Sequence, residues 1–131
     1  MSERNVAIVT GGSAGIGAEI CRRMIAQGYE VISLALQRPA RSDKHLHAIE
    51  VDLTDATATA QVAADVASRF EVTHVVHNAG AIRPALLGDV KAEDLNALTQ
   101  LHLGAALALV QSVLPGMKAN GFGRIDRKSV V

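Results

Sequence analysis

The stretch VTGGSAGIG, residues 9–17, places four glycines in nine positions directly behind an apolar run. Glycine weakens helix and strand interiors, so such a cluster indicates a turn, a phosphate-binding loop or simple looseness. Residues 5–10 are apolar and rich in β-branched side chains, which predicts a buried strand ahead of the cluster. Behind it, apolar side chains recur every four residues from Ile16 to Met24, and Gly28 is placed to end the predicted helix. The glycines therefore join a strand to the N-terminus of a helix.

The composition is that of a globular protein. The 131 residues are 49% hydrophobic and 20% charged, which argues against disorder and fits one domain over residues 1–131. Thirteen basic and thirteen acidic residues cancel, so no charged field attracts nucleic acid or anionic lipid. Aromatic residues make up only 2%, which argues against stacking on single-stranded nucleic acid. We expect no nucleic-acid partner.

The cellular setting is predicted from three features. Cys21 is the single cysteine, so an internal disulfide cannot form. The N-terminal MSERN is polar, and we expect no run that approaches membrane-spanning length. We expect a cytoplasmic protein that does not contact a membrane.

Strand-like and helix-like segments alternate along the chain. Further strands are predicted at residues 30–36, 47–53 and 73–80, and helices at 55–70 and 92–118. This alternation predicts an α/β fold, with a parallel sheet between two layers of helices.

The last residues, 126–131, depart from this pattern. Asp126, Arg127 and Lys128 would occupy the middle of a fifth strand, and a buried parallel strand tolerates three successive charges poorly. We therefore expect a truncated sheet of about four strands, with the fourth strand at its edge and the tail outside the sheet.

The glycine cluster suits an anion. A helix N-terminus offers free backbone N–H groups and the positive end of the helix dipole. Gly11 would allow a tight turn, Gly15 the close approach of a pyrophosphate, and Gly17 close packing of the helix on the strand. The alternative is that the glycines only shape a turn between strand and helix.

The spacing Thr10-Gly11-x-x-x-Gly15-x-Gly17 resembles the TGxxxGxG motif of the classical short-chain dehydrogenases/reductases. Asn-Ala-Gly at residues 78–80 and Asp-Leu at residues 52–53 stand where that family has comparable motifs. Residues 101–125 resemble the family's long interface helix and the approach to its fifth strand. The resemblance covers residues 5–125 and implies a Rossmann-like, doubly wound sheet that binds a nicotinamide dinucleotide.

The family's cofactor-binding roles carry over to matching positions. The resemblance implies that the glycine turn holds the pyrophosphate, that Ser13 contacts a phosphate or ribose, and that residues 52–53 and 78–80 surround the adenosine. Asp52 has a plainer alternative, since an aspartate before Thr54 also caps helices. The predicted cofactor-binding residues in these motifs are Thr10, Gly11, Ser13, Gly15, Ile16, Gly17, Asp52, Leu53, Asn78, Ala79 and Gly80.

The end of the second predicted strand bears on the choice between NAD and NADP. An acidic residue there would bind the ribose hydroxyls of NAD, whereas a nearby arginine accommodates the additional phosphate of NADP. Ala35 and Leu36 fill the deciding positions, and Arg38 and Arg41 follow. This favours NADP, with Arg38 as a cofactor-binding residue. The alternative is that both arginines are solvated loop charges.

The residues that perform hydride transfer in the family are absent from these 131 residues. The family uses a serine and a Tyr-x-x-x-Lys pair, but the single tyrosine here, Tyr29, is followed four residues later by Ser33. Alignment without gaps places Val130 at the catalytic serine and His102 at the family's helical asparagine. A histidine there could bond a backbone group or relay a proton, or it could be an ordinary helix histidine.

Metal binding is not expected, because the two-residue spacing of His45 and His47 lacks a completing ligand. The resemblance implies an oxidoreductase that transfers hydride between nicotinamide and a carbonyl or alcohol carbon of a small molecule. Without the family's catalytic residues we expect little or no turnover by this chain. The alternatives are a non-catalytic dinucleotide-binding module, or a homo-oligomerisation module that associates through residues 92–118.

Overall fold

The computed structural model describes residues 4–127. Its five strands form one parallel sheet in the order β3-β2-β1-β4-β5. The strands are β1 (Val6–Thr10), β2 (Glu30–Ala35), β3 (Leu46–Glu50), β4 (His74–His77) and β5 (Arg124–Arg127). The main helices are α1 (Gly15–Ala26), α2 (Ala56–Arg69), α3 (Ala92–Thr99) and α4 (Ala105–Asn120), with a π-helical turn η2 (Gln100–Gly104) between the last two and a short turn η1 (Leu87–Asp89).

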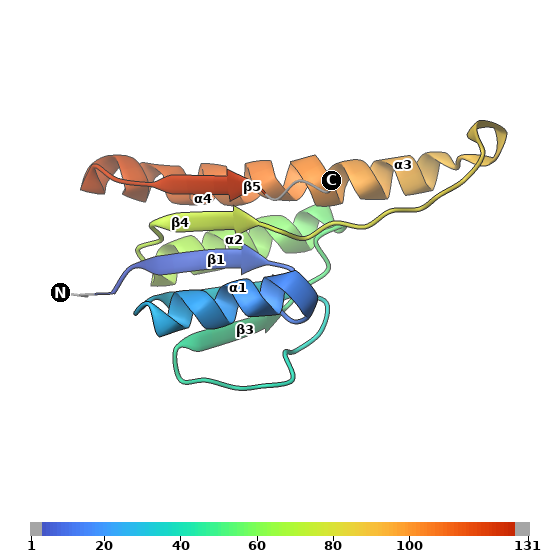
Figure 1. Cartoon of the computed structure of the whole chain (residues 1–131). Coiled ribbons are helices and arrows are strands. Elements are labelled where there is room, and N and C mark those ends of the chain that lie inside the picture. The colour runs from blue at the N-terminus through green and yellow to red at the C-terminus, as the bar shows by residue number, and fades with distance from the viewer. Residues whose placement is uncertain (1–3, 128–131) are drawn as a thin grey trace.

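The helices cover both faces of the sheet, because side chains alternate along each strand. Ile8 belongs to one apolar cluster with residues of α2 and α4, whereas the neighbouring Val9 belongs to another cluster that contains Cys21 of α1. Figure 1 shows α1 in front of the sheet and α2 and α4 behind it. The predicted three-layer, Rossmann-like α/β fold is confirmed.

The fifth strand corrects the prediction of about four strands. β5 pairs with β4, so β4 lies inside the sheet and not at its edge. All four residues of β5 are exposed, so Asp126 and Arg127 stay in contact with water and avoid the cost of burying a charge. Asp126 also accepts a hydrogen bond from Arg124 Nε at 3.0 Å. The error came from treating an edge strand as a buried one.

The long helix predicted at residues 92–118 is interrupted. A π-helical turn, η2, separates α3 from α4, which runs on to Asn120. Figure 1 shows α3 and the preceding extended segment projecting beyond the carboxyl ends of the strands.

This helical run also corrects the expectation that no segment reaches membrane-spanning length. Among residues 4–127, one stretch, Ala92–Asn120, is long and apolar enough to cross a membrane by length and composition. Four residues one turn apart, Ala105, Leu109, Val113 and Met117, are buried, and three of them belong to the cluster shared with the sheet and α2. We therefore treat this helix as a layer of the α/β domain.

The connection between β2 and β3 is a loop without a helix over residues 36–45, all of which the structure describes. A parallel crossover of this kind is commonly a helix that covers the sheet. Here a loop takes the place of that helix beside α1. The loop and α1 form the two walls of the groove described below.

Candidate nucleotide-binding site

The glycine turn lies where ligands bind in doubly wound sheets. It follows β1, which lies in the middle of the sheet. β2 and β3 lie on one side of β1, and β4 and β5 lie on the other. Gly11 donates its N–H to Leu34 O of β2 at 2.8 Å, and its φ of +68° lets the chain turn at the end of β1. The turn is therefore at the carboxyl ends of the strands, at the point where strand order reverses.

The N-terminus of α1 is open toward solvent. Ala14 is the N-cap residue, and no side chain among the described residues caps the helix or places a carboxylate in its first turn. Gly15 has φ +57°, and a Cβ built on it would meet nothing within 4 Å. Uncapped N–H groups and empty space beside a glycine form a cradle that an anion fits.

Gly17 has a different role, because it lies directly on the turn. A Cβ at this position would be 1.9 Å from Gly11 O and 2.6 Å from Asn78 Nδ2. Only glycine therefore allows α1 to pack this closely on the end of β1.

The hydroxyl of Thr10 joins the glycine turn to the segment that follows β4. Thr10 is fully buried, and its Oγ1 accepts the N–H groups of Asn78 at 3.0 Å and Ala79 at 2.9 Å. Asn78 Nδ2 donates to Gly11 O at 3.2 Å. The structure thus brings together the two motifs that the sequence predicted to surround one ligand.

His77 was missed as a member of this site. Its Nδ1 lies 3.0 Å from Thr10 Oγ1 and its Nε2 lies 3.0 Å from Leu101 O in η2. The imidazole is buried, with 4% of its surface exposed. The available signal was its position immediately before the Asn-Ala-Gly motif.

His102 contacts the other end of the same segment. Its Nε2 is 2.9 Å from Ala81 O and 3.2 Å from Ala81 N, so one tautomer donates and the other accepts. A Cβ at Gly80 would be 2.7 Å from the ring of His102. Of the interpretations offered for this residue, the geometry matches bonding to a backbone group.

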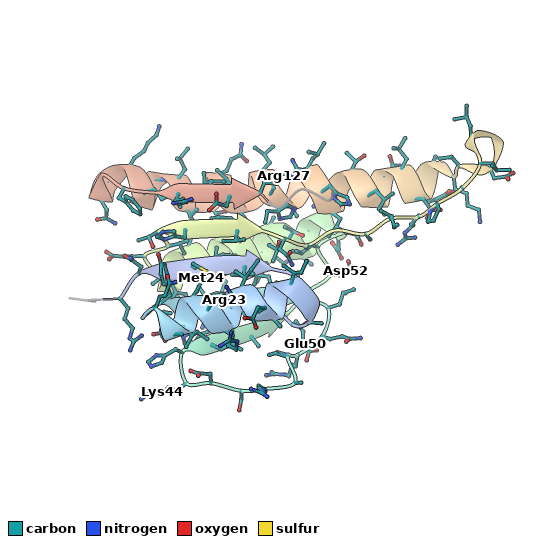
Figure 2. The ribbon with its side chains drawn as sticks, viewed as in Figure 1. Arg23, Met24, Lys44, Glu50, Asp52 and Arg127 are labelled. Carbon is teal, nitrogen blue, oxygen red and sulfur yellow. The ribbon has the colours of Figure 1, made fainter. Side chains whose placement is uncertain are left out.

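Asp52 and Leu53 follow β3 at the same end of the sheet. Figure 2 shows Asp52 and Glu50 at the carboxyl end of β3. Asp52 Oδ1 accepts from Thr54 N at 2.9 Å and from Thr54 Oγ1, and these bonds lower the pKa of its carboxyl group. The N-cap of α2 is Asp55 and not Asp52, so the alternative that Asp52 caps this helix was wrong. Both bonds to Thr54 use Oδ1.

A groove of about 960 Å³ runs from the glycine turn along α1. Its walls are α1 and the loop between β2 and β3, and its lining includes Ser13, Gly15, Arg41 and Ser42. Cys21 also lines it, and burial raises the pKa of this thiol to about 11, which makes it a poor nucleophile.

The two arginines after β2 differ in their surroundings. Arg38 lies outside the groove lining, and its Nε is 3.2 Å from Glu50 Oε1. Arg41 lines the groove, and no ion-pair partner is found for it among residues 4–127. Of the two arginines, Arg41 is therefore the one that lines the groove leading from the turn.

The remaining histidines and the tyrosine make structural contacts. Glu30 accepts from His45 Nδ1 at 2.9 Å and from His47 Nε2 at 3.0 Å, so a carboxylate lies between these two histidines. No group of three or more ligands in metal-binding geometry occurs within the described residues.

Tyr29 OH is 3.3 Å from His74 Nε2. Val130, predicted at the catalytic serine position, lies outside the described residues.

A glycine turn at the reversal point of a parallel sheet defines a Rossmann-like nucleotide-binding domain. The family model for short chain dehydrogenases matches residues 5–126, and the chain belongs to this family.

Similar proteins agree with this assignment. The acetoacetyl-CoA reductase of Acinetobacter sp. (strain RA3849) is 31% identical over all of this chain, which spans 58% of that relative. A short-chain dehydrogenase from Streptomyces avermitilis has 32% identity and a TM-score of 0.86, over 97% of this chain and 50% of its own. A 3-oxoacyl (acyl-carrier-protein) reductase from Agrobacterium tumefaciens C58, solved with NADP bound, has 28% identity and a TM-score of 0.82, over 94% and 51%. This chain therefore spans about half the length of these relatives.

Proposed function

We propose that this chain is the nucleotide-binding part of an NADP(H)-dependent oxidoreductase. The observation that carries the proposal is the cradle formed by the uncapped N-terminus of α1 and Gly15, tied through Thr10 to residues 78–79. A pyrophosphate in the cradle would accept the free N–H groups of the first turn of α1. The adenosine would then extend toward Asp52 and Leu53 and toward the groove beside Ser13. Bound dinucleotide would supply the hydride-carrying nicotinamide.

The reaction class follows from the family. Both named reductases among the similar proteins support reduction of a carbonyl group, and we propose a small carbonyl or alcohol substrate for the whole catalytic unit. The 131 residues contain no Tyr-x-x-x-Lys pattern, so the general acid of the family has no counterpart in them. We therefore propose that this chain binds the dinucleotide without appreciable turnover by itself. A cytoplasmic location is part of the proposal and rests on the neutral composition and the single cysteine.

Titration of the purified chain with NADP(H) and NAD(H), followed by calorimetry and thermal unfolding, tests the proposal. Ligand at 100 times its Kd is expected to stabilise the chain by about 2.7 kcal/mol. Gly15→Ala is expected to weaken binding at least tenfold, because its methyl group would enter the cradle. Gly28→Ala is the matched control, since Gly28 also has positive φ and open space but lies beyond the far end of α1. Equal losses in both variants, or no stabilisation of the wild type by either dinucleotide, would contradict the proposal.

We propose that Arg41, and not the predicted Arg38, binds the 2′-phosphate of NADP. Arg41 shares the groove with Ser13 and Ser42, whereas the charge of Arg38 is already matched by Glu50. Charge-assisted hydrogen bonds to phosphate are among the strong ones. Arg41→Ala is therefore expected to weaken NADP binding on the order of ten- to a hundredfold while NAD binding is unchanged. Arg38→Ala is the control, and a larger loss of NADP affinity in that variant would reverse the assignment.

A homo-oligomer through residues 92–118 is the second candidate function. The specific observation is that Leu95, Leu103 and Leu107 on this helical run are each more than half exposed. Burial of such side chains between two copies would be favourable by the hydrophobic effect. Sedimentation velocity of the wild-type chain that detects only monomer across the accessible concentration range would rule this out.

A further inference from the structure

The hydrogen bonds around His77 admit one arrangement of protons. Leu101 O is a carbonyl and can only accept, so His77 Nε2 carries the ring hydrogen. Thr10 Oγ1 accepts two backbone N–H groups, so its own hydrogen is donated to His77 Nδ1. The neutral imidazole, with Nδ1 as an acceptor, therefore satisfies every group in the network.

A second proton on this ring would break the network. It would sit on Nδ1 and point at Thr10 Oγ1, whose lone pairs are already occupied by the N–H groups of Asn78 and Ala79. One of those N–H groups, or the imidazolium, would then be left without an acceptor in a buried position, which is costly.

The surroundings of His77 also oppose a positive charge. Burial is the largest cause that lowers the pKa of this imidazole, and the carbonyl of Leu101 acts against that lowering. The charged or titratable groups that act on the ring are Arg127, its neighbour on β5, and the side chain of His102 in η2, and the charge of each favours the neutral form. The backbone of His102 acts in the opposite direction, as the carbonyl of Leu101 does. Thr10 on β1 is neutral. No carboxylate among the described residues acts on the ring to favour its protonation.

We propose that His77 is a positioning residue whose neutral ring holds residues 78–79 against the glycine turn, so that protonation of this ring releases the segment and weakens dinucleotide binding. The inference rests on the proposed dinucleotide function and adds a proton-dependent control of the same site. His77 acts through Thr10 and is not itself placed against the ligand. The affinity should consequently fall as the pH falls, and it should fall up to tenfold per pH unit below the pKa of His77.

Stability should follow the same direction. The pKa of histidine in an unfolded chain is about 6.5, and that of His77 in the folded chain is lower. Its contribution to the free energy of unfolding is therefore complete above about pH 6.5 and is lost as the pH falls through the lower, folded value. His74, the first residue of β4, also has a pKa lowered by burial, so it contributes to the pH dependence of stability in the same direction.

The test compares the dinucleotide Kd of wild type, His77→Asn and His74→Asn between pH 8 and about pH 5. Asparagine keeps a donor and an acceptor without titrating in this range, so the Kd of His77→Asn, relative to its own value at pH 8, should lose the acid-side weakening. His74→Asn is the matched control, because His74 is also buried but lies at the opposite end of β4, bonded to Tyr29 and Thr73. It should change the pH dependence of stability but keep the wild-type pH dependence of Kd.

The 2′-phosphate of NADP has a second pKa of about 6 and also titrates in this range. Its titration affects wild type and variants alike, so it cancels when their pH profiles of Kd are compared. The same pH series with NAD, which lacks the 2′-phosphate, gives an independent measure of the pH dependence of Kd. His77→Leu should weaken binding at every pH, because it removes both hydrogen bonds. An unchanged Kd profile in His77→Asn, or an equal flattening in His74→Asn, overturns the inference. Absence of binding to wild type at pH 8 overturns the proposed function, and this inference with it.

Discussion

Replacement of Thr10 by valine is expected to destabilise the folded chain by about 4 kcal/mol. Valine keeps the shape of threonine but removes the hydroxyl that accepts from Asn78 N and Ala79 N and donates to His77 Nδ1. Each buried polar group left without a partner costs about 1–3 kcal/mol. Equilibrium unfolding in urea, with and without dinucleotide, measures the loss. We also expect weaker dinucleotide binding, because the segment at residues 78–79 loses its attachment to β1.

Thr10→Ser is the matched control for this prediction. Serine retains the hydroxyl and removes one buried methyl group, so the expected cost is about 1 kcal/mol. A similar loss in the serine and valine variants would show that the methyl group, and not the hydroxyl, is what stabilises this position. The structure places the hydroxyl at the centre of the three bonds, and we expect the valine variant to be clearly the worse.

Replacement of Gly17 by alanine is expected to destabilise the chain by about 3 kcal/mol and to lower the thermal midpoint by about 10 °C. The added methyl carbon would be 1.9 Å from Gly11 O, a backbone atom that cannot move without shifting the turn. α1 would have to withdraw from the end of β1, which also displaces the cradle. Thermal unfolding followed by circular dichroism measures the effect.

Gly116→Ala provides the comparison within α4. A Cβ at Gly116 meets nothing within 4 Å, and alanine has the higher helix propensity by about 1 kcal/mol. This variant should be as stable as wild type or slightly more so. If Gly17→Ala unfolds at the same temperature as Gly116→Ala, the close packing of α1 on the turn does not limit this position.

Local patterns accounted for most elements of the fold. β1, the glycine turn and α1 came from an apolar run, a glycine spacing and a four-residue repeat, all within a short stretch of chain. Gly28 ends α1 as predicted: its φ is +96°, and it donates to Ile25 O while Tyr29 N donates to Met24 O. These features depend on backbone preferences and on side chains close in sequence, so they were readable without the rest of the molecule.

The edge of the sheet was not readable in this way. The same residues, Asp126 and Arg127, argue against a strand if the strand is buried and are acceptable if it is exposed. Whether a strand is central or at an edge depends on strand order. Local sequence patterns contain no such information, because strand order is a property of the whole sheet.

In the candidate site, too, some features could be predicted from local sequence and others depend on the tertiary structure. The sequence by itself determined the strand, the glycine turn and the helix N-terminus, since spacing and backbone preference act over a few residues. Only the tertiary structure decided that Thr10 lies against Asn78, that His77 spans from β1 to η2, and that Arg38 pairs with Glu50 while Arg41 lines the groove. These contacts join residues up to about 70 positions apart, and burial and pairing at that range depend on how the strands are ordered and packed.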